Sequence, residues 1–266
     1  MHDTIRRINR ISQGIGLLVA GTALLTAGGI ASAATYKGAA VRVGKGTAHI
    51  VVHTAKSGKP SSVAVMMTPG ALKGLPTALN KKTAEGSWEY ALPMPKHGPK
   101  TGYTHVVIDW NPHGHPPPHV YTVPHFDFHF YGISTAAVKK VSFTGPKDPA
   151  TKVSNGALIP PDYKVIPDTA VNEMGVHAVD LTAPEFHGKP FTATFIYGYD
   201  KGQMTFVEPM VTLAYLNTKP NLSLPVKTPA QYSRSGYYPT RYSVRYDAHS
   251  KAYLVALDGL KHWGKK

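Results

Sequence analysis

Prolines and glycines interrupt this sequence too often for it to be built mainly of long helices. The 266 residues include 23 prolines and 25 glycines. A proline inside a helix removes a backbone hydrogen bond and clashes with the preceding turn. Many of the segments between these residues alternate apolar and polar side chains or are rich in β-branched residues, as strands are. We therefore predict a mainly β fold, either a single antiparallel β-barrel or a sandwich, with long proline-rich loops.

Nine segments carry the pattern of strands, and four of them form two predicted hairpins. The nine segments are Ala48–His53, Ser62–Met67, His105–Trp110, His125–Ile133, Val138–Phe143, Phe191–Tyr199, Gln203–Glu208, Tyr242–Asp247 and Ala252–Leu257. The loops Asp200–Gly202 and Ala248–Lys251 are expected to close the hairpins. A short, irregular helix is expected after Pro69. Long proline-rich connections are expected at residues 93–102, 145–169 and 218–239. Loops of this length usually carry function or bind a partner.

The first 33 residues have the three parts of a secretory signal sequence. Three arginines lie within the first ten residues, an apolar stretch follows at Ile15–Ala27, and small residues at Ala31–Ala33 precede the expected cleavage site. The apolar stretch is shorter than the about 20 residues that a membrane-spanning helix needs. We predict a cleaved signal-peptide helix at residues 1–33 and a single β-rich metal-binding domain at residues 34–266. The protein is then periplasmic or extracellular, without a stable membrane anchor.

Composition narrows the partners and the kinds of metal ligand. The chain contains no cysteine, so disulfides and thiolate metal sites are excluded. Its net charge of +14 favours anionic partners. The lysines are scattered through predicted loops and form no basic helical stripe, so nucleic acid is not an expected partner. A small-molecule ligand, oligomerisation, and the choice between the general secretory and the twin-arginine export routes stay open.

A histidine-rich segment, residues 110–133, is the most informative part of the sequence for function. Its second half alternates with the period of a strand. One face of this strand carries three phenylalanines: Phe126, Phe128 and Phe130. The other face carries two histidines with an aspartate between them: His125, Asp127 and His129. The phenylalanine face is expected to be core, whereas imidazole and carboxylate groups on the opposite face are typical metal ligands.

The geometry of a strand limits how many of these residues one ion can bind. Residues i and i+4 lie about 13 Å apart at about 3.3 Å per residue. A histidine places a metal only about 6–7 Å from its own Cα, given a metal–nitrogen distance of about 2 Å. His125 and His129 are therefore not expected to share an ion on an unbulged strand, whereas Asp127 can join either neighbour. Further ligands must come from other segments.

Three other places supply candidate ligands. His113 and His115 flank a glycine on a proline-bounded loop, and His177 follows Met174-Gly175. Glu208 shares a strand face with apolar side chains, where an ionised carboxylate is costly unless a cation or donor meets it. The predicted metal-binding residues are His113, His115, His125, Asp127, His129, His177 and Glu208. Imidazole and carboxylate without thiolate suit Zn²⁺ first, with Mn²⁺, Fe²⁺ and Cu²⁺ left open.

Several long motifs resemble an uncharacterised family of exported bacterial proteins. They are WNPHGHPPP at 110–118, VPHFDFHFY at 123–131, MGVH at 174–177, FVEPMV at 206–211 and YPTRYSVRYD at 238–247. The resemblance implies a β-barrel-like exported domain with a metal site at His115, His125, His129, His177 and Glu208. A weaker similarity links the His113-x-His115 pair to the metal barrels of cupins. Pro118-His119 stands there in place of the glutamate that a cupin has a few residues later.

Three functions remain open at this point. The chain could be a metal-dependent enzyme of unknown substrate in the cell envelope, a non-catalytic protein that binds a metal or an apolar ligand, or a stress-related structural envelope protein. It has no G-x-S-x-G elbow, P-loop or H-E-x-x-H motif, so the sequence does not decide whether it is an enzyme. Three protein ligands with an open position would favour catalysis over a closed structural site.

Overall fold

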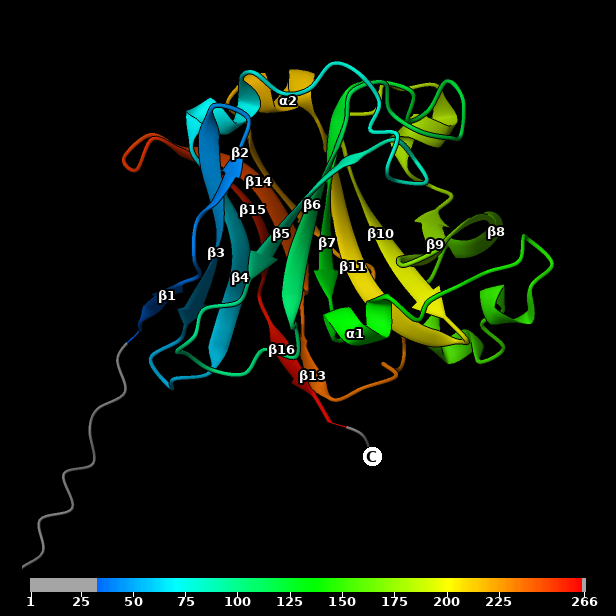
Figure 1. Cartoon of the computed structure of the whole chain (residues 1–266). Helices are drawn as coiled ribbons and strands as arrows, with labels where there is room; N and C mark the ends of the chain where they lie inside the picture. The colour runs from blue at the N-terminus through cyan, green and yellow to red at the C-terminus, as the bar shows by residue number, and fades with distance from the viewer. Residues whose placement is uncertain (1–32, 265–266) are drawn as a thin grey trace, which may run out of the picture. The chain divides into compact units, whose positions relative to one another are not determined.

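The computed structural model describes residues 33–264, which fold into antiparallel strands (Figure 1). Apart from Ala33, the predicted signal sequence at residues 1–33 lies outside the described residues. One sheet contains β1 (Thr35–Lys37), β2 (Val41–Val43), β3 (Gly46–Thr54), β4 (Pro60–Met67), β12 (Asn221–Pro225), β14 (Arg241–Asp247) and β15 (Ala252–Asp258). The other contains β5 (Trp88–Pro93), β6 (His105–Asn111), β7 (His125–Tyr131), β8 (Tyr163–Val171), β9 (Gly175–Asp180), β10 (Ala193–Asp200) and β11 (Gln203–Thr212). β13 (Gly236–Tyr238) pairs with β16 (Lys261–Trp263).

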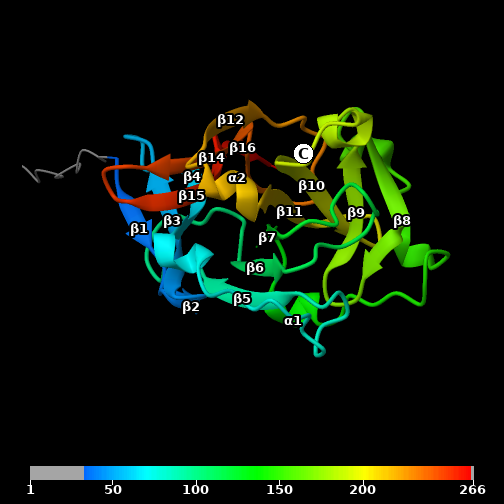
Figure 2. The ribbon, with the colours of Figure 1, turned by 90° about the horizontal axis from the view of Figure 1, so that it is seen from above.

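The two large sheets have open strand orders and face each other (Figure 2). Of the two predicted architectures, barrel and sandwich, the fold is therefore a sandwich. The first sheet has the order β1-β3-β4-β15-β14-β12, with β2 also paired to β3. The second has the order β5-β6-β7-β11-β10-β9-β8. Strands that are far apart in sequence are thus neighbours: β7 lies between β6 and β11, and β4 pairs with β15. The mainly β prediction is confirmed.

The core lies between the sheets and includes the phenylalanine face of β7. Phe126, Phe128 and Phe130 are all fully buried in it. Phe195 of β10 reaches across to Tyr242 of β14, with 5.3 Å between the ring centroids. Burying one such side chain stabilises the fold by about 1.5–3 kcal/mol. The alternation along β7 therefore fixes its orientation, because turning the strand over would take three phenylalanines out of this core and bring its charged residues into it.

The remaining elements are short. The helices are α1 (Thr135–Val138) and α2 (Leu213–Asn217), with 3₁₀ turns at Pro69–Leu72, Pro149–Thr151, Gly156–Leu158 and Pro184–His187. The strand predicted at Val138–Phe143 is wrong, because Ser134 accepts a hydrogen bond from the Ala137 amide and caps a helical turn there. Within residues 33–264, no helix is long and apolar enough to cross a membrane.

Other predicted elements need smaller corrections. The helix expected after Pro69 is a single 3₁₀ turn. The first hairpin turns on two residues, not three, because Asp200 pairs with Gln203. Lys201 and Gly202 both have positive φ, at 50° and 70°, as the favoured two-residue hairpin turn requires. Part of the long connection at residues 145–169 belongs to β8, an edge strand in which Pro167 is tolerated.

Candidate metal centre

The polar face of β7 meets a second row of polar residues on β6. The antiparallel register places Asn111 opposite His125 and Asp109 opposite Asp127. Both rows lie on the side of the sheet away from the phenylalanine core. Directly opposed like charges destabilise a sheet, and both aspartates are buried. This face therefore needs positive charge close to the two carboxylates.

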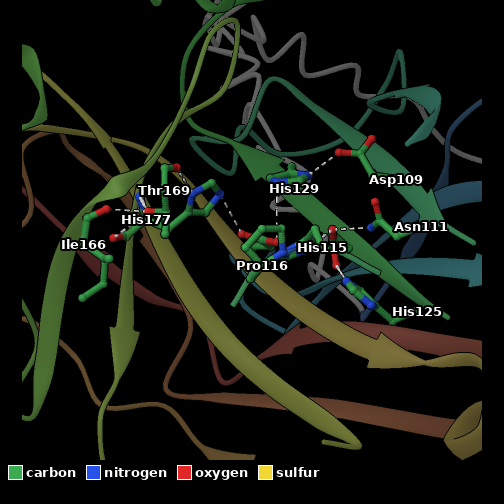
Figure 3. A network of polar contacts seen from close by, with 11 residues as sticks. Asp109, Asn111, His115, Pro116, His125, His129, Ile166, Thr169 and His177 are labelled. Atoms are coloured by element: carbon green, nitrogen blue, oxygen red, sulfur yellow. Dashed lines mark hydrogen bonds and ion pairs between the residues drawn. The ribbon is translucent and has the colours of Figure 1, made fainter. Parts of the chain in front are cut away.

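The first group of candidate ligands, the first triad, consists of His115, His125 and Asp127. His115 Nε2 lies 3.4 Å from Asp127 Oδ2, and His125 Nε2 lies 3.1 Å from Asp127 Oδ1. The Asn111 amide donates a hydrogen bond of 2.7 Å to Asp127 Oδ2 and orients the carboxylate. The predicted pairing of His125 with Asp127 is thus present, together with one of the two loop histidines (Figure 3).

The second triad consists of His129, His177 and Glu208, from β7, β9 and β11. His129 Nε2 lies 3.5 Å from Glu208 Oε1, and His177 Nε2 lies 3.7 Å from Glu208 Oε2. Behind the His129 ring, Nδ1 lies 3.2 Å from Asp109 Oδ2. His125 and His129 belong to different triads, in agreement with the distance argument from the sequence.

The second nitrogen of three of the four histidines donates a hydrogen bond to a backbone carbonyl oxygen. Nδ1 of His115 donates to the carbonyl oxygen of Pro116 at 2.8 Å, and Nδ1 of His125 to that of Val123 at 2.7 Å. Since a carbonyl oxygen can only accept, Nδ1 carries the proton, and Nε2 of the neutral ring presents a lone pair to the carboxylate. Two acceptors then face each other unless a proton or a cation lies between them.

His177 and His129 follow the same arrangement. Nδ1 of His177 donates to the carbonyl oxygen of Thr169 at 2.7 Å, and the carboxylate of Asp109 takes this place for His129. Such outer partners fix the tautomer and the ring orientation of metal-binding histidines. For His129 the contact with Asp109 is an ion pair and not a hydrogen bond of regular geometry. Among the described residues, five buried atoms of the two triads have no hydrogen-bond partner: His125 Nε2, Asp127 Oδ1, both ring nitrogens of His129, and Glu208 Oε2. All four histidines therefore aim Nε2 at a carboxylate.

The spacing within both triads suits an ion better than a direct hydrogen bond. Charge-assisted N–H···O bonds are about 2.7–2.9 Å long. Two ligands of one tetrahedral ion, each about 2.0–2.1 Å from the metal, lie about 3.3 Å apart. The four nitrogen–oxygen distances in the triads run from 3.1 to 3.7 Å. The ligand atoms of each triad all lie within 4.8 Å of one another, so two imidazoles and one carboxylate could hold an ion in each.

Local backbone features bring His115 and His177 into place. Gly114 has φ of 68°, and a Cβ there would overlap the carbonyl oxygen of Tyr121, so only glycine lets the loop fold back beside β7. In β8, the pairing with β9 shifts register between Ile166 and Val171, where Pro167 cannot donate to the ladder. This irregularity leaves the carbonyl of Thr169 to hold the His177 ring.

The ring of Phe206 contacts both histidines of the second triad. The Phe206 ring packs edge-on against His129 with 4.7 Å between centroids and lies 5.4 Å from His177. Gly198, on the adjacent strand, makes room for this ring, because a Cβ at that position would overlap it. Phe206 therefore limits how far either histidine can turn.

Burial and the opposed carboxylates shift the pKa values in the first triad. Burial disfavours the charged form of His115, but the hydrogen bond to Asp127 and the charge of Asp127 raise the pKa of His115 to about 10. Burial also favours the neutral acid of Asp127, yet His125 and His115 hold the pKa of this carboxyl well below its usual range. Without a metal, a proton on His115 takes the place of a cation.

The second triad shows the same competition for protons. Burial opposes charge on His129, but Glu208 and Asp109 raise its pKa to about 10. Burial raises the pKa of Glu208 to about 8, even though His129 acts against this shift. Burial lowers the pKa of His177 to about 4. His177 therefore stays neutral near pH 7, as a metal-binding imidazole must.

A cavity of about 340 Å³ opens onto this centre. All three residues of the second triad line it, together with His115 and Asp127 of the first, whereas His125 does not. Glu85 lies where this cavity adjoins a second one of about 700 Å³, and burial raises the pKa of its carboxyl. The second triad thus contacts the cavity with all three of its residues, and the first triad with two.

The structure places the seven residues predicted from the sequence in three groups. Six of them form the two triads, and His113 is exposed and belongs to neither. Sequence reasoning did not identify Asp109, Asn111 or Glu85. For Asp109 and Asn111 a signal existed, because they alternate with the buried Ile108 and Trp110, Asp109 within the strand predicted at His105–Trp110 and Asn111 directly after it. For Glu85, in a segment without regular structure, no such signal existed.

Comparison with known proteins adds one partial similarity. Residues 56–110 match a family model described as TTHB210-like, hypothetical protein TTHB210. The matched segment is less than half of the chain, contains Glu85 and Asp109, and ends before the first residue of either triad. The match is consistent with the expected similarity to an uncharacterised family. No curated protein and no solved structure matches the chain.

Proposed function

We propose that this protein is an exported metal-binding protein that holds two divalent ions, one in each triad. One observation carries the proposal: four buried or half-buried histidines direct Nε2 at carboxylate oxygens 3.1–3.7 Å away, while Nδ1 of each contacts an acceptor. Two imidazoles and one carboxylate without thiolate suit Zn²⁺ first. Each ion would replace the protons that otherwise compensate Asp127 and Glu208.

Metal content of variants tests this proposal. Protein purified after dialysis against Zn²⁺ should retain two ions per chain. His115→Ala should lose the ion of the first triad, and His177→Ala that of the second, so that each retains one. The matched control is His113→Ala, an exposed histidine of the same loop, which should retain both ions. Equal losses in His113→Ala and His115→Ala, or no bound metal in the unaltered protein, would contradict the proposal.

Export of the protein is part of the same proposal. It is supported by the positive, apolar and small-residue parts of residues 1–33 and by the absence of cysteine from the metal ligands. Ala34, the first residue after the expected cleavage site, accepts a hydrogen bond from the Thr54 amide and donates one to the Thr54 hydroxyl, and processing there leaves β1 whole. Expression of the full chain in a bacterium should give a periplasmic or secreted protein that begins at Ala34. An unprocessed cytoplasmic product would refute this part.

A metal-dependent enzyme is the second candidate, favoured by the cavity at the second triad. Three protein ligands leave a tetrahedral ion one open position, as in catalytic zinc sites. A divalent ion there would polarise an oxygen atom of a bound molecule. Release of p-nitrophenol from p-nitrophenyl acetate by the Zn²⁺-loaded protein, lost in His177→Ala and kept in His113→Ala, would support catalysis. Equal rates in all three proteins would favour a non-catalytic binding protein.

A further inference from the structure

The second triad has protein contacts behind its histidines and a cavity on its other side. Asp109 contacts the His129 ring and the carbonyl of Thr169 holds the His177 ring, while His129, His177 and Glu208 all line the cavity. The fourth position of a tetrahedral ion in this triad therefore lies toward the cavity. His125 of the first triad is fully buried and does not line it. A bound molecule would thus reach the second triad.

The walls of the cavity combine the polar residues of the metal centre with a group of apolar side chains. They include Phe143, Met174, Val179, Ile196 and Met210. Small-molecule sites have volumes of about 300–1,000 Å³ and combine apolar walls with a few polar groups. At about 340 Å³, the cavity is at the small end of that range. Its occupant is therefore compact, with an apolar part for the apolar side of the cavity.

The charges around the cavity select the polar part of the occupant. An ion of charge +2 with one carboxylate and two neutral imidazoles keeps a net charge of +1. Among residues 33–264, no lysine or arginine lines the cavity, so the ions in the two triads would supply the positive charge that attracts an anion. Glu85 and Asp168 also line the cavity and disfavour an occupant with more than one negative charge.

On the basis of the proposed function, we propose that this cavity binds a small monocarboxylate with an apolar body, whose carboxylate oxygen takes the open position of the ion in the second triad. The apolar walls receive the body of the ligand, and the ion replaces the arginine or lysine that carboxylate sites commonly use. Phosphate and other small dianions fit poorly, because they lack an apolar body and are repelled by the acidic side chains.

Cobalt-substituted protein tests this inference separately from metal binding. Co²⁺ in a site of nitrogen and oxygen ligands gives visible absorption bands that change when a ligand enters its coordination sphere. The bands themselves report on the proposed function. Benzoate should then shift them saturably, whereas benzamide, its neutral isostere, and inorganic phosphate should bind at least tenfold more weakly. Normal bands that do not respond to millimolar benzoate, or that respond equally to benzamide or phosphate, would overturn the inference while leaving metal binding intact. Absence of the bands would refute both.

Two variants locate the binding. Ala170 is a half-buried residue of the edge strand β8 and lines the cavity. The variant Ala170→Phe should fill part of the cavity without removing a core side chain. This variant should keep the Co²⁺ bands and bind benzoate at least tenfold more weakly. The control Ala248→Phe, in the exposed turn between β14 and β15, should bind it as the unaltered protein does. Equal benzoate affinity in the two variants would place the ligand outside the cavity. If Ala170→Phe does not fold, the comparison of benzoate with benzamide on the unaltered protein still tests whether the ion binds a carboxylate.

Discussion

Filling both triads with metal should release between about two and three protons at pH 7.5. With pKa values of about 10, His115 and His129 are almost fully protonated in the metal-free protein at this pH. Glu208, with a pKa of about 8, titrates together with His129, because the Glu208 charge raises the pKa of His129, so it carries part of a third proton. His177, at about 4, carries none. A metal ligand must be deprotonated, so these protons leave on binding. With ordinary pKa values, the same residues would release only roughly 0.2 protons.

Titration calorimetry with Zn²⁺ in buffers of different ionisation enthalpy measures this number. Because protons compete with the ions, the affinity should rise with pH, and the number of protons released should fall as the pH passes through 8 and approaches 10. His115→Ala should release about one proton fewer, and the matched control His113→Ala should release the unaltered number. Release of less than one proton at saturation and pH 7.5 would refute the claim that protons on His115 and His129 compensate the carboxylates in the metal-free protein.

Three further predictions concern stability and packing. Phe128→Ala should lower the free energy of unfolding by about 3–5 kcal/mol in urea titrations, because it opens a cavity between the sheets. Gly198→Ala should push the Phe206 ring toward the second triad, and metal analysis should find one ion per chain instead of two. The metal-free protein should melt at lower temperature as the pH rises from about 6.5 to 10, because folded His115 and His129 keep protons over this range that the unfolded chain has already lost. Scanning calorimetry should show this loss without Zn²⁺ and a much smaller one with it.

The orientation of β7, and which of its side chains lie on each face, could be predicted from local sequence. Strict alternation separates Phe128 from Asp127, and the period of a strand is enough to assign one to the core and the other to the opposite face. The distance along a strand also excludes a shared ion for His125 and His129. These are properties of one segment, and they need no knowledge of which strands are its neighbours.

The assembly of the centre depends on pairings between distant segments. That Asp109 lies opposite Asp127, and that Glu208 lies beside His129, follows from the order β6-β7-β11, which no local pattern reveals. The irregularity in β8 is a similar case. Pro167 suggested a loop, yet at a sheet edge it is compatible with a strand and leaves the carbonyl of Thr169 to His177. Sequence could therefore name most ligands but could not divide them between two sites.

The wrongly predicted strand has a related cause. Val138, Val141 and Phe143 are buried, so their apolar character correctly indicated contact with the core. Burial here comes from a capped helical turn and the loop after it, which the Ser134 cap begins. Short apolar segments fit a strand and a buried turn equally well, because period alone cannot separate them over so few residues.

The most direct test of the two-ion centre is anomalous scattering from a crystal of the protein soaked in Zn²⁺. We predict two peaks at the zinc edge, one in each triad, each about 2.0–2.1 Å from the Nε2 atoms of its two histidines. The second ion should have an open position toward the cavity. A single peak shared by His125 and His129, peaks bound through Nδ1, or no peak at either triad would contradict the account.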